Sequence, residues 1–234
     1  MEQPPIGRAI TADQEHPVRF AWMARIFGKV MAGYVALVAR TCRVSGPPIT
    51  QDQVIFAIWH ESNLVAAIAA WKLRNEKQPV VFSTRGFRGI VMNTMLRSFG
   101  SRVVTLPDEG TATRAEAAAL SREMARLGRT GASLVISCDG PSGPYRVAKP
   151  GVVIVARESG LPIQPWAVTS RPPFRLNRRW DRMIVALPFG RLHVHEGAQL
   201  RVGDRERLKP RLAALQAELE RVQALSDGVG SREA

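Results

Sequence analysis

Apolar and polar positions follow two different patterns along this chain. Residues 1–17 are polar and contain prolines, which predicts a flexible arm. Apolar residues dominate 18–44, with basic residues recurring among them, and this pattern predicts an amphipathic helix. From residue 50 to 227, short apolar runs alternate with helical periodicity. Residues 228–234 are expected to be a flexible tail.

The short apolar runs predict the strands of one sheet. They lie at residues 53–59, 79–84, 102–106, 132–138, 161–168, 182–187 and 192–200. Helices are predicted at residues 63–77, 89–99, 112–128, 151–159 and 205–226, with Pro210 marking the true start of the last one. Strands that alternate with helices pair in parallel and are covered on both faces. The pattern therefore predicts a single α/β domain with a central, mostly parallel sheet flanked by helices.

The apolar segment at 18–44 has two possible roles. Its uninterrupted apolar run, Val30 to Ala39, is shorter than the roughly 20 residues that span a bilayer. The helix could lie in a membrane interface, with its basic residues at the lipid phosphates. It could equally pack on the domain as an ordinary amphipathic helix. The pattern leaves both possibilities open.

The charge balance is strongly basic. Thirty-three Lys and Arg stand against twenty Asp and Glu, giving a formal net charge of +13. Such a surface suits nucleic acid, acidic lipid headgroups or phosphorylated cofactors, and composition alone does not choose among them. Cys42 and Cys138 are too few for a disulfide framework, and no secretory signal is evident, so we expect a reducing, cytosolic setting.

Polar residues follow two predicted strands at the edge where ligands bind in open α/β sheets. "IFAIWHESNL" (55–64) places His60 and Glu61 there, and "CDGPSGP" (138–144) follows another strand. A helix N-terminus disfavours the imidazolium, so a neutral His60 could act as a general base; the plainer alternative is a structural histidine. Glu61 is its neighbour in sequence, but adjacent helical residues do not face each other. Glu61 could be a catalytic partner, a charge favourable to the helix dipole, or a surface group.

The stretch "DGPSGPYR" (139–146) predicts a fixed loop, because two glycines and two prolines fall within six residues. Its backbone N–H groups and nearby basic side chains suit an anion. The residues expected to bind substrate are Asp139, Gly140, Pro141, Ser142, Gly143 and Arg146. The alternative is a tight turn with a capping aspartate.

An arginine-rich stretch, "SRPPFRLNRRWDR" (170–182), interleaves Phe174 and Trp180 with basic residues. It could bind nucleic acid by phosphate contact and stacking, dock on an anionic membrane, or be a solvated loop. No nucleic-acid-binding motif accompanies it, so we do not expect nucleic acid as a partner.

Two further possibilities are weaker. His193 and His195 point to one face of a predicted strand, but no further ligand is near in sequence, so we predict no metal site. A hydrolase built on Cys138 and His60 is conceivable. Cys138 lies within a buried strand pattern, however, which is typical of an inert core thiol.

Several motifs together resemble a known family. "IFAIWH", "DGPSGP", "KPGVVIVARESGLPIQP" and "WDRMIVALPF" occur in this order between about residues 50 and 200. They resemble the bacterial branch of the lysophospholipid acyltransferase-like superfamily, which typically shows a W-H pair, S-x-x-x-D-G, D-G-P-x-G-P, K-P-G and W-D. One of these motifs alone would be weak, but their shared order is specific.

The resemblance implies an α/β acyltransferase domain that follows a membrane-associating helical segment. The reaction would move a fatty acyl group from acyl-CoA or acyl carrier protein to a lysolipid or related amphiphilic acceptor. No cofactor beyond this acyl donor is implied. His60 matches the family histidine, the general base, and the DGPSGP loop matches the segment that grips acceptor phosphate or stabilises charge. We expect a peripheral protein on an anionic membrane surface, the cytoplasmic face of the bacterial inner membrane.

The chain departs from the family pattern at the carboxylates. The superfamily shows H-x-x-x-x-D, but Val65 stands five residues after His60, and the aspartate of S-x-x-x-D-G falls on Arg88. The carboxylates that could substitute are Glu61, Asp108, Glu109 and Asp139. Our expected catalytic pair is His60 with Glu61, and substrate contacts are also expected from Ser83, Arg85 and Arg88. The alternative is a weakened or inactive member that binds lipid or acyl carrier without turnover.

Overall fold

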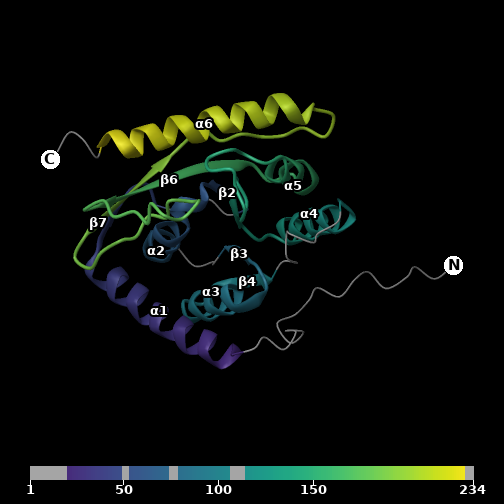
Figure 1. Ribbon diagram of the computed structural model, residues 1–234. Helices are drawn as coiled ribbons and strands as arrows, with labels where there is room; N and C mark the ends of the chain where they lie inside the picture. The colour runs from purple at the N-terminus through teal and green to yellow at the C-terminus, as the bar shows by residue number, and fades with distance from the viewer. Residues whose placement is uncertain (1–19, 49–52, 74–78, 106–113, 230–234) are drawn as a thin grey trace.

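The computed structural model describes residues 20–48, 53–73, 79–105 and 114–229 (Figure 1). The predicted arm at 1–17 lies outside these residues. So do Asp108 and Glu109, two of the carboxylates considered as partners for His60.

One seven-stranded sheet forms the centre of the molecule, in the order β1-β7-β6-β2-β5-β3-β4. Its strands are β1 (Arg43–Ser45), β2 (Ile55–Ile58), β3 (Val80–Ser83), β4 (Arg102–Thr105), β5 (Leu134–Ser137), β6 (Ile163–Arg171) and β7 (Arg191–Glu196). All neighbouring strands are parallel except β6 and β7, which pair antiparallel. The predicted mostly parallel α/β domain is confirmed.

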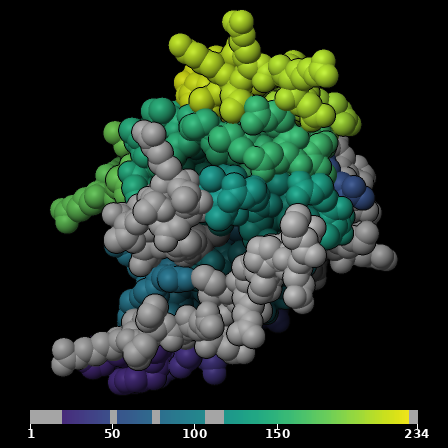
Figure 2. All heavy atoms as spheres, turned by 90° about the vertical axis from the view of Figure 1, so that its right-hand side faces the viewer, coloured from purple at the N-terminus to yellow at the C-terminus, as the bar shows by residue number. Residues whose placement is uncertain are grey.

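Helices cover both faces of the sheet. They are α1 (Ala21–Thr41), α2 (Asn63–Leu73), α3 (Gly86–Ser98), α4 (Arg114–Arg129), α5 (Gly151–Ser159) and α6 (Leu208–Val229). Figure 1 shows α1, α2 and α3 on one side and α4, α5 and α6 on the other. Figure 2, turned to face α4 and α5, shows the C-terminal segment with α6 at one end and α1 at the opposite end.

The central strand β2 contributes to both hydrophobic cores. Phe56 and Ile58 pack into the core beneath α1, α2 and α3, whereas Ile55 and Ala57 pack into the core beneath α4, α5 and α6. Successive side chains of a strand point to opposite faces, so a strand covered on both sides must be apolar throughout. This explains the unbroken apolar run before His60.

One predicted strand is wrong, and one observed strand was not predicted. Residues 182–187 form no strand; a single antiparallel bridge joins Ile184 to Arg175. Ile184 and Ala186 are buried in the core from a loop, so burial rather than strand pairing explains their apolar pattern. The short strand β1 was not predicted, because three residues directly after a helix carry no clear periodicity.

Helix α1 packs on α3 through small residues. Ala24, Gly28 and Ala32 are buried on this face. A Cβ atom at Gly28 would lie 2.6 Å from the Cβ of Thr94 and 2.9 Å from the carbonyl oxygen of Val91, so the two helices are in close contact there. Glycine therefore permits the close approach of α1 to α3.

The other face of α1 exposes large apolar side chains. They are Phe20 just before the helix, and Trp22, Met23, Ile26, Phe27, Val30 and Leu37 within it. The helix of 21 residues is long and apolar enough to cross a membrane by length and composition, although part of it is buried on the domain. One face of α1 thus packs on the domain and the other is apolar and exposed, and the membrane-interface role stays a prediction.

Candidate active site

His60 lies where the sheet opens at the C-terminal end of β2. It begins a short 3-10 turn, His60–Ser62, which leads into α2. Strand β2 pairs with β5 in parallel, with Ile58 opposite Ser137. The ends of both strands therefore meet, and the backbone N–H of His60 donates to Oδ1 of Asp139 at 2.9 Å. The expected meeting of the two motifs is confirmed.

Asp139 serves as a backbone anchor. It is completely buried, and its Oδ2 accepts from the backbone N–H of Arg146 at 3.3 Å. Burial raises the pKa of Asp139 to about 6; the negative charge of Glu61 adds to this rise, while the N–H groups of His60 and Arg146 oppose it. These two hydrogen bonds of Asp139 join the turn at His60 to the DGPSGP loop, and both come from backbone N–H groups rather than from the imidazole ring.

The imidazole of His60 faces a different carboxylate. Its Nε2 lies 3.9 Å from Oδ2 of Asp181, and its ring packs against Trp180 with centroids 5.2 Å apart. Nδ1 is buried without a hydrogen-bond partner in the described part of the chain. Burial lowers the pKa of His60; Asp181 opposes this, whereas Arg179 and Lys149 lower the pKa further. These effects favour the neutral imidazole that a general base requires.

Asp181 is held in place by its own neighbour. It is completely buried, and Arg179 donates to its two oxygens at 2.8 and 2.9 Å. Burial by itself would raise the pKa of Asp181, but Arg179 and His60 together with the N–H of Met183 hold it below its usual value. Asp181 was not among the carboxylates considered from the sequence. The signal that could have found it is the W-D pair that opens "WDRMIVALPF", in which Asp181 directly follows Trp180.

The carboxylate of Glu61 lies in a buried ion cluster, and its predicted catalytic role stays a prediction. It is completely buried, and Arg146 donates to its Oε1 at 2.9 and 2.6 Å, while Tyr145 and Arg175 donate to its Oε2 at 2.7 and 2.5 Å. Asp227, in the last turn of α6, accepts from the same two arginines at 3.2 and 3.1 Å. Adjacent residues of a helical turn point in different directions, so Glu61 enters this ion cluster while His60 faces Asp181.

The DGPSGP loop packs against the segment between β6 and β7, residues 172–190. Gly140 and Gly143 both have positive φ. A Cβ at Gly143 would lie 2.9 Å from the Trp180 ring, and a Cβ at Gly140 would lie 2.7 Å from Nζ of Lys149. The glycines thus allow Trp180 and Lys149 to approach the loop closely. Pro141 is partly buried and Ser142 is exposed, and their predicted substrate contacts stay predictions.

The remaining predicted substrate residues lie further along the same sheet edge. Ser83 ends β3, and Arg85 and Arg88 lie at the start of α3. Strand β5 separates β3 from β2, so these side chains begin two strands, or about 10 Å, from His60. Ser83 is buried and Arg88 is exposed. Arg146, also predicted to bind substrate, is instead held by Glu61 and Asp227 in this structure.

Two other groups do not form part of this site. Burial, with the charge of Asp139, raises the pKa of the Cys138 thiol, as expected for an inert core cysteine. The rings of His193 and His195 pack edge to face with centroids 4.5 Å apart, and they contact Ser45 and Thr169 respectively. Among the described residues, no group of three or more His, Cys, Asp or Glu side chains could hold a metal ion.

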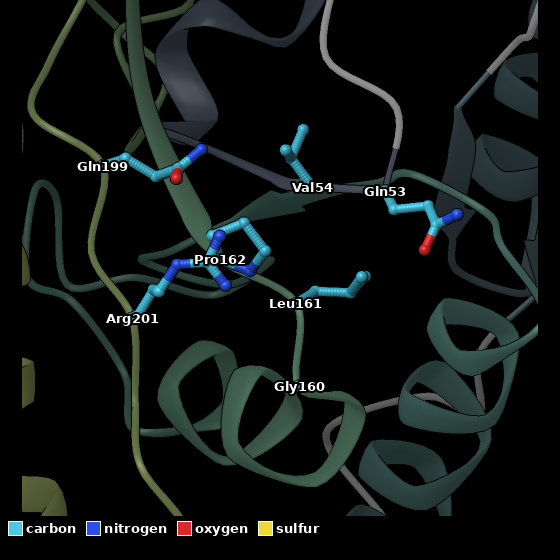
Figure 3. A pocket seen from close by; sticks show the side chains of 7 residues that line it. All are labelled: Gln53, Val54, Gly160, Leu161, Pro162, Gln199 and Arg201. Atoms are coloured by element: carbon cyan, nitrogen blue, oxygen red, sulfur yellow. The ribbon is translucent and has the colours of Figure 1, made fainter.

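A hollow of about 440 Å³ lies at the other end of the sheet. It is lined by Gln53, Val54, Gly160, Leu161, Pro162, Gln199 and Arg201. Figure 3 shows Gln199 and Arg201 extending toward Pro162, whereas Gln53 points away. Val54 and Pro162 precede β2 and β6, so the hollow is separated from His60 by the length of β2.

Known proteins provide a fold comparison. A structure of the 1-acyl-sn-glycerophosphate (LPA) acyltransferase PlsC from Thermotoga maritima aligns with a TM-score of 0.52 and 12% sequence identity, covering 91% of this chain and 81% of that chain. An uncharacterised protein of Rickettsia prowazekii is 26% identical over 152 residues, 65% of this chain and 66% of the relative, just under two thirds of its length. No protein-family profile matches the chain. The structural likeness shows that this chain has an acyltransferase-like α/β fold.

Proposed function

We propose that this protein transfers a fatty acyl group from a thioester, acyl-CoA or acyl carrier protein, to a hydroxyl of a lysolipid or related amphiphile. The observation that carries this proposal is the position of His60. Its imidazole lies at the C-terminal end of the central strand of an acyltransferase-like fold, beside a buried carboxylate and a basic loop. Ligands bind at this edge in open α/β sheets.

The proposed reaction needs one base and no metal or redox step. His60 removes the proton from the acceptor hydroxyl as the oxygen attacks the thioester carbonyl carbon. The resulting tetrahedral intermediate collapses, the C–S bond breaks, and an ester forms. The leaving sulfur takes the proton back from the imidazolium, which restores neutral His60. The lowered pKa of His60 supports the first step, because the ring must begin unprotonated.

Basic groups near the ring suit the anionic parts of such substrates. Lys149 lies in the DGPSGP loop region, and Arg179 lies beside Asp181. Arg85 and Arg88 project from the start of α3 at the same edge of the sheet. We propose that these cations receive phosphate groups of the donor or acceptor, since charge-assisted hydrogen bonds to phosphate are strong and directional.

We further propose that the protein works at an anionic membrane surface on the cytoplasmic side of a bacterial membrane. The exposed face of α1 carries large apolar side chains together with Arg25, Lys29 and Arg40. Such a face buries apolar groups at the acyl boundary while its cations meet lipid phosphates. A lysolipid acceptor would reach the site from that surface.

The test is turnover by the purified full chain with acyl-CoA or acyl carrier protein and a panel of lysolipids. We expect product in the native protein and a loss of about 100- to 10,000-fold in His60→Ala, the usual contribution of a positioned acid–base group. His193→Ala is the matched control, because that histidine is exposed on β7 and its ring meets Ser45 and His195. Equal turnover in His60→Ala would overturn the mechanism.

A second candidate is a protein that binds lipid or acyl carrier without turnover. The observation in its favour is Val65, which occupies the position of the family aspartate and is completely buried in the core. Vesicle or carrier binding by the native chain, with no product from any donor–acceptor pair, would favour this candidate over the enzyme.

A further inference from the structure

Val65 cannot orient an imidazole, but another carboxylate lies near the ring of His60. Asp181 belongs to the segment between β6 and β7, and its Oδ2 lies 3.9 Å from Nε2 of His60. This separation is too long for a hydrogen bond but close enough for a direct interaction between charges. Catalytic hydrogen bonds are often long in the absence of substrate and shorten in the reacting complex.

We propose that Asp181 is the positioning residue for His60, taking the place of the aspartate that Val65 replaces. In this arrangement Nε2 carries the ring proton toward Asp181 and Nδ1 keeps the lone pair; because Nδ1 is buried, the groups that cover it must move for the acceptor hydroxyl to reach it. Asp181 also stabilises the imidazolium that forms when the acceptor proton is taken. The role of Asp181 rests on the proposed function of His60, but its effect on the ring can be measured without turnover.

Three features hold Asp181 in this position. Its side chain is completely buried, and the guanidinium of Arg179 donates to both oxygens, which fixes the plane of the carboxylate. The Trp180 ring, between these two residues in sequence, packs on the imidazole and on Gly143. Ile184 N donates to the carbonyl oxygen of Glu61 at 2.8 Å, so the segment that carries Asp181 is hydrogen-bonded to the turn that carries His60.

The charges around the ring make the proposal testable by sign. Asp181 favours the imidazolium, whereas Arg179 and Lys149 disfavour it. Asp139 contacts the backbone N–H of His60, and Glu61 is engaged by Arg146 and Arg175. Removing Asp181 should therefore lower the pKa of the ring, and removing Arg179 should raise it. General loosening of the fold would not move the pKa in opposite directions.

The experiment is a ¹⁵N and ¹H NMR titration of the histidine rings in the full chain, which has four histidines. His60→Gln assigns the His60 signal. We expect the Nε2–H tautomer in the native protein, a fall in the pKa of His60 on the order of one unit in Asp181→Asn, and a rise in Arg179→Gln. Arg178→Gln is the matched control, because it removes the same charge from an exposed neighbouring side chain and should shift the ring less.

An unchanged pKa in Asp181→Asn, or shifts of the same direction in both variants, would overturn the proposal. If Asp181→Asn does not fold, the direction of the pKa shift in Arg179→Gln decides.

In the acyl-transfer assay, Asp181→Asn should lower kcat by at least about 10-fold with little change in KM, and move the acid limb of the pH profile to lower pH. Opposite NMR shifts in a protein without turnover would support the role of Asp181 while contradicting the proposed function. Turnover that is unaffected by Asp181→Asn would support the proposed function while contradicting the role of Asp181.

Discussion

The backbone N–H of His60 donates to Asp139, whose other oxygen accepts from the N–H of Arg146. One buried carboxylate thus joins the histidine turn to the loop that follows β5. Parallel pairing of β2 with β5 brings the two segments to the same edge, and Asp139 fixes their spacing. Because Asp139 is completely buried in this position, it has a structural role and its carboxyl group ionises less readily than an exposed one.

This burial predicts an unusual dependence of stability on pH. The pKa of Asp139 is raised from 3.8 to about 6, so between these values the folded protein holds a proton that the unfolded chain releases. The contribution of Asp139 to stability is therefore full below about pH 4 and is lost as the pH rises to about 6, by on the order of 3 kcal/mol. Urea unfolding across this pH range measures it. Asp139→Asn, which cannot ionise, should flatten the slope in this window; an unchanged slope would contradict the assignment.

The buried ion cluster predicts a large difference between its two carboxylates. Glu61→Gln leaves Arg146 and Arg175 without their buried partner, and should cost about 3–5 kcal/mol of unfolding free energy. Asp227 contacts the same arginines, but its side chain is 45% exposed. Asp227→Asn should therefore cost less than about 1 kcal/mol. Urea unfolding at neutral pH compares the two variants, and equal costs would show that burial does not set the energy of this cluster.

Two glycines of α1 provide a matched test of how the helix packs. Gly28→Ala places a methyl group against Thr94 and Val91, and should cost about 1–3 kcal/mol of unfolding free energy through overpacking. Gly33 has no atom within 4 Å of the corresponding position. Gly33→Ala should therefore stabilise the protein by up to about 1 kcal/mol, the difference in helix propensity. Similar effects from both substitutions, measured by urea unfolding, would contradict close packing of α1 on α3.

Much of the fold could be predicted from the sequence because its periodicity is local. The unbroken apolar run of β2 and the helices between strands indicated a parallel sheet covered on both faces, and the strand-end rule placed His60 beside the DGPSGP loop. The position of Asp181 could not be predicted in the same way. It depends on how the segment from 172 to 190 folds back over the sheet edge, which no local pattern describes.

The same limit explains why the position of Glu61 could not be predicted. Sequence adjacency to His60 suggested a shared chemical role, but the direction of each side chain depends on distant partners. Arg146 and Arg175 come from two separate segments, and they draw the Glu61 carboxylate into a buried cluster in which Asp227 accepts from the same arginines. Glu61, next to the candidate base in sequence, therefore supports the structure around it. Among the described residues, the carboxylate within 4 Å of the ring is that of Asp181, 121 positions after His60.

The exposed face of α1 predicts binding to anionic vesicles. Ile26 and Phe27 are 55% and 54% exposed, and replacing both by glutamine should weaken binding by at least about 10-fold, since burying each such side chain contributes about 1.5–3 kcal/mol. Leu225→Gln is the control, because Leu225 is 48% exposed on α6, at the opposite end of the molecule. Sedimentation with vesicles of phosphatidylglycerol and phosphatidylcholine measures binding. An unaltered affinity in the α1 variant, or an equal loss in Leu225→Gln, would show that α1 does not form the membrane contact.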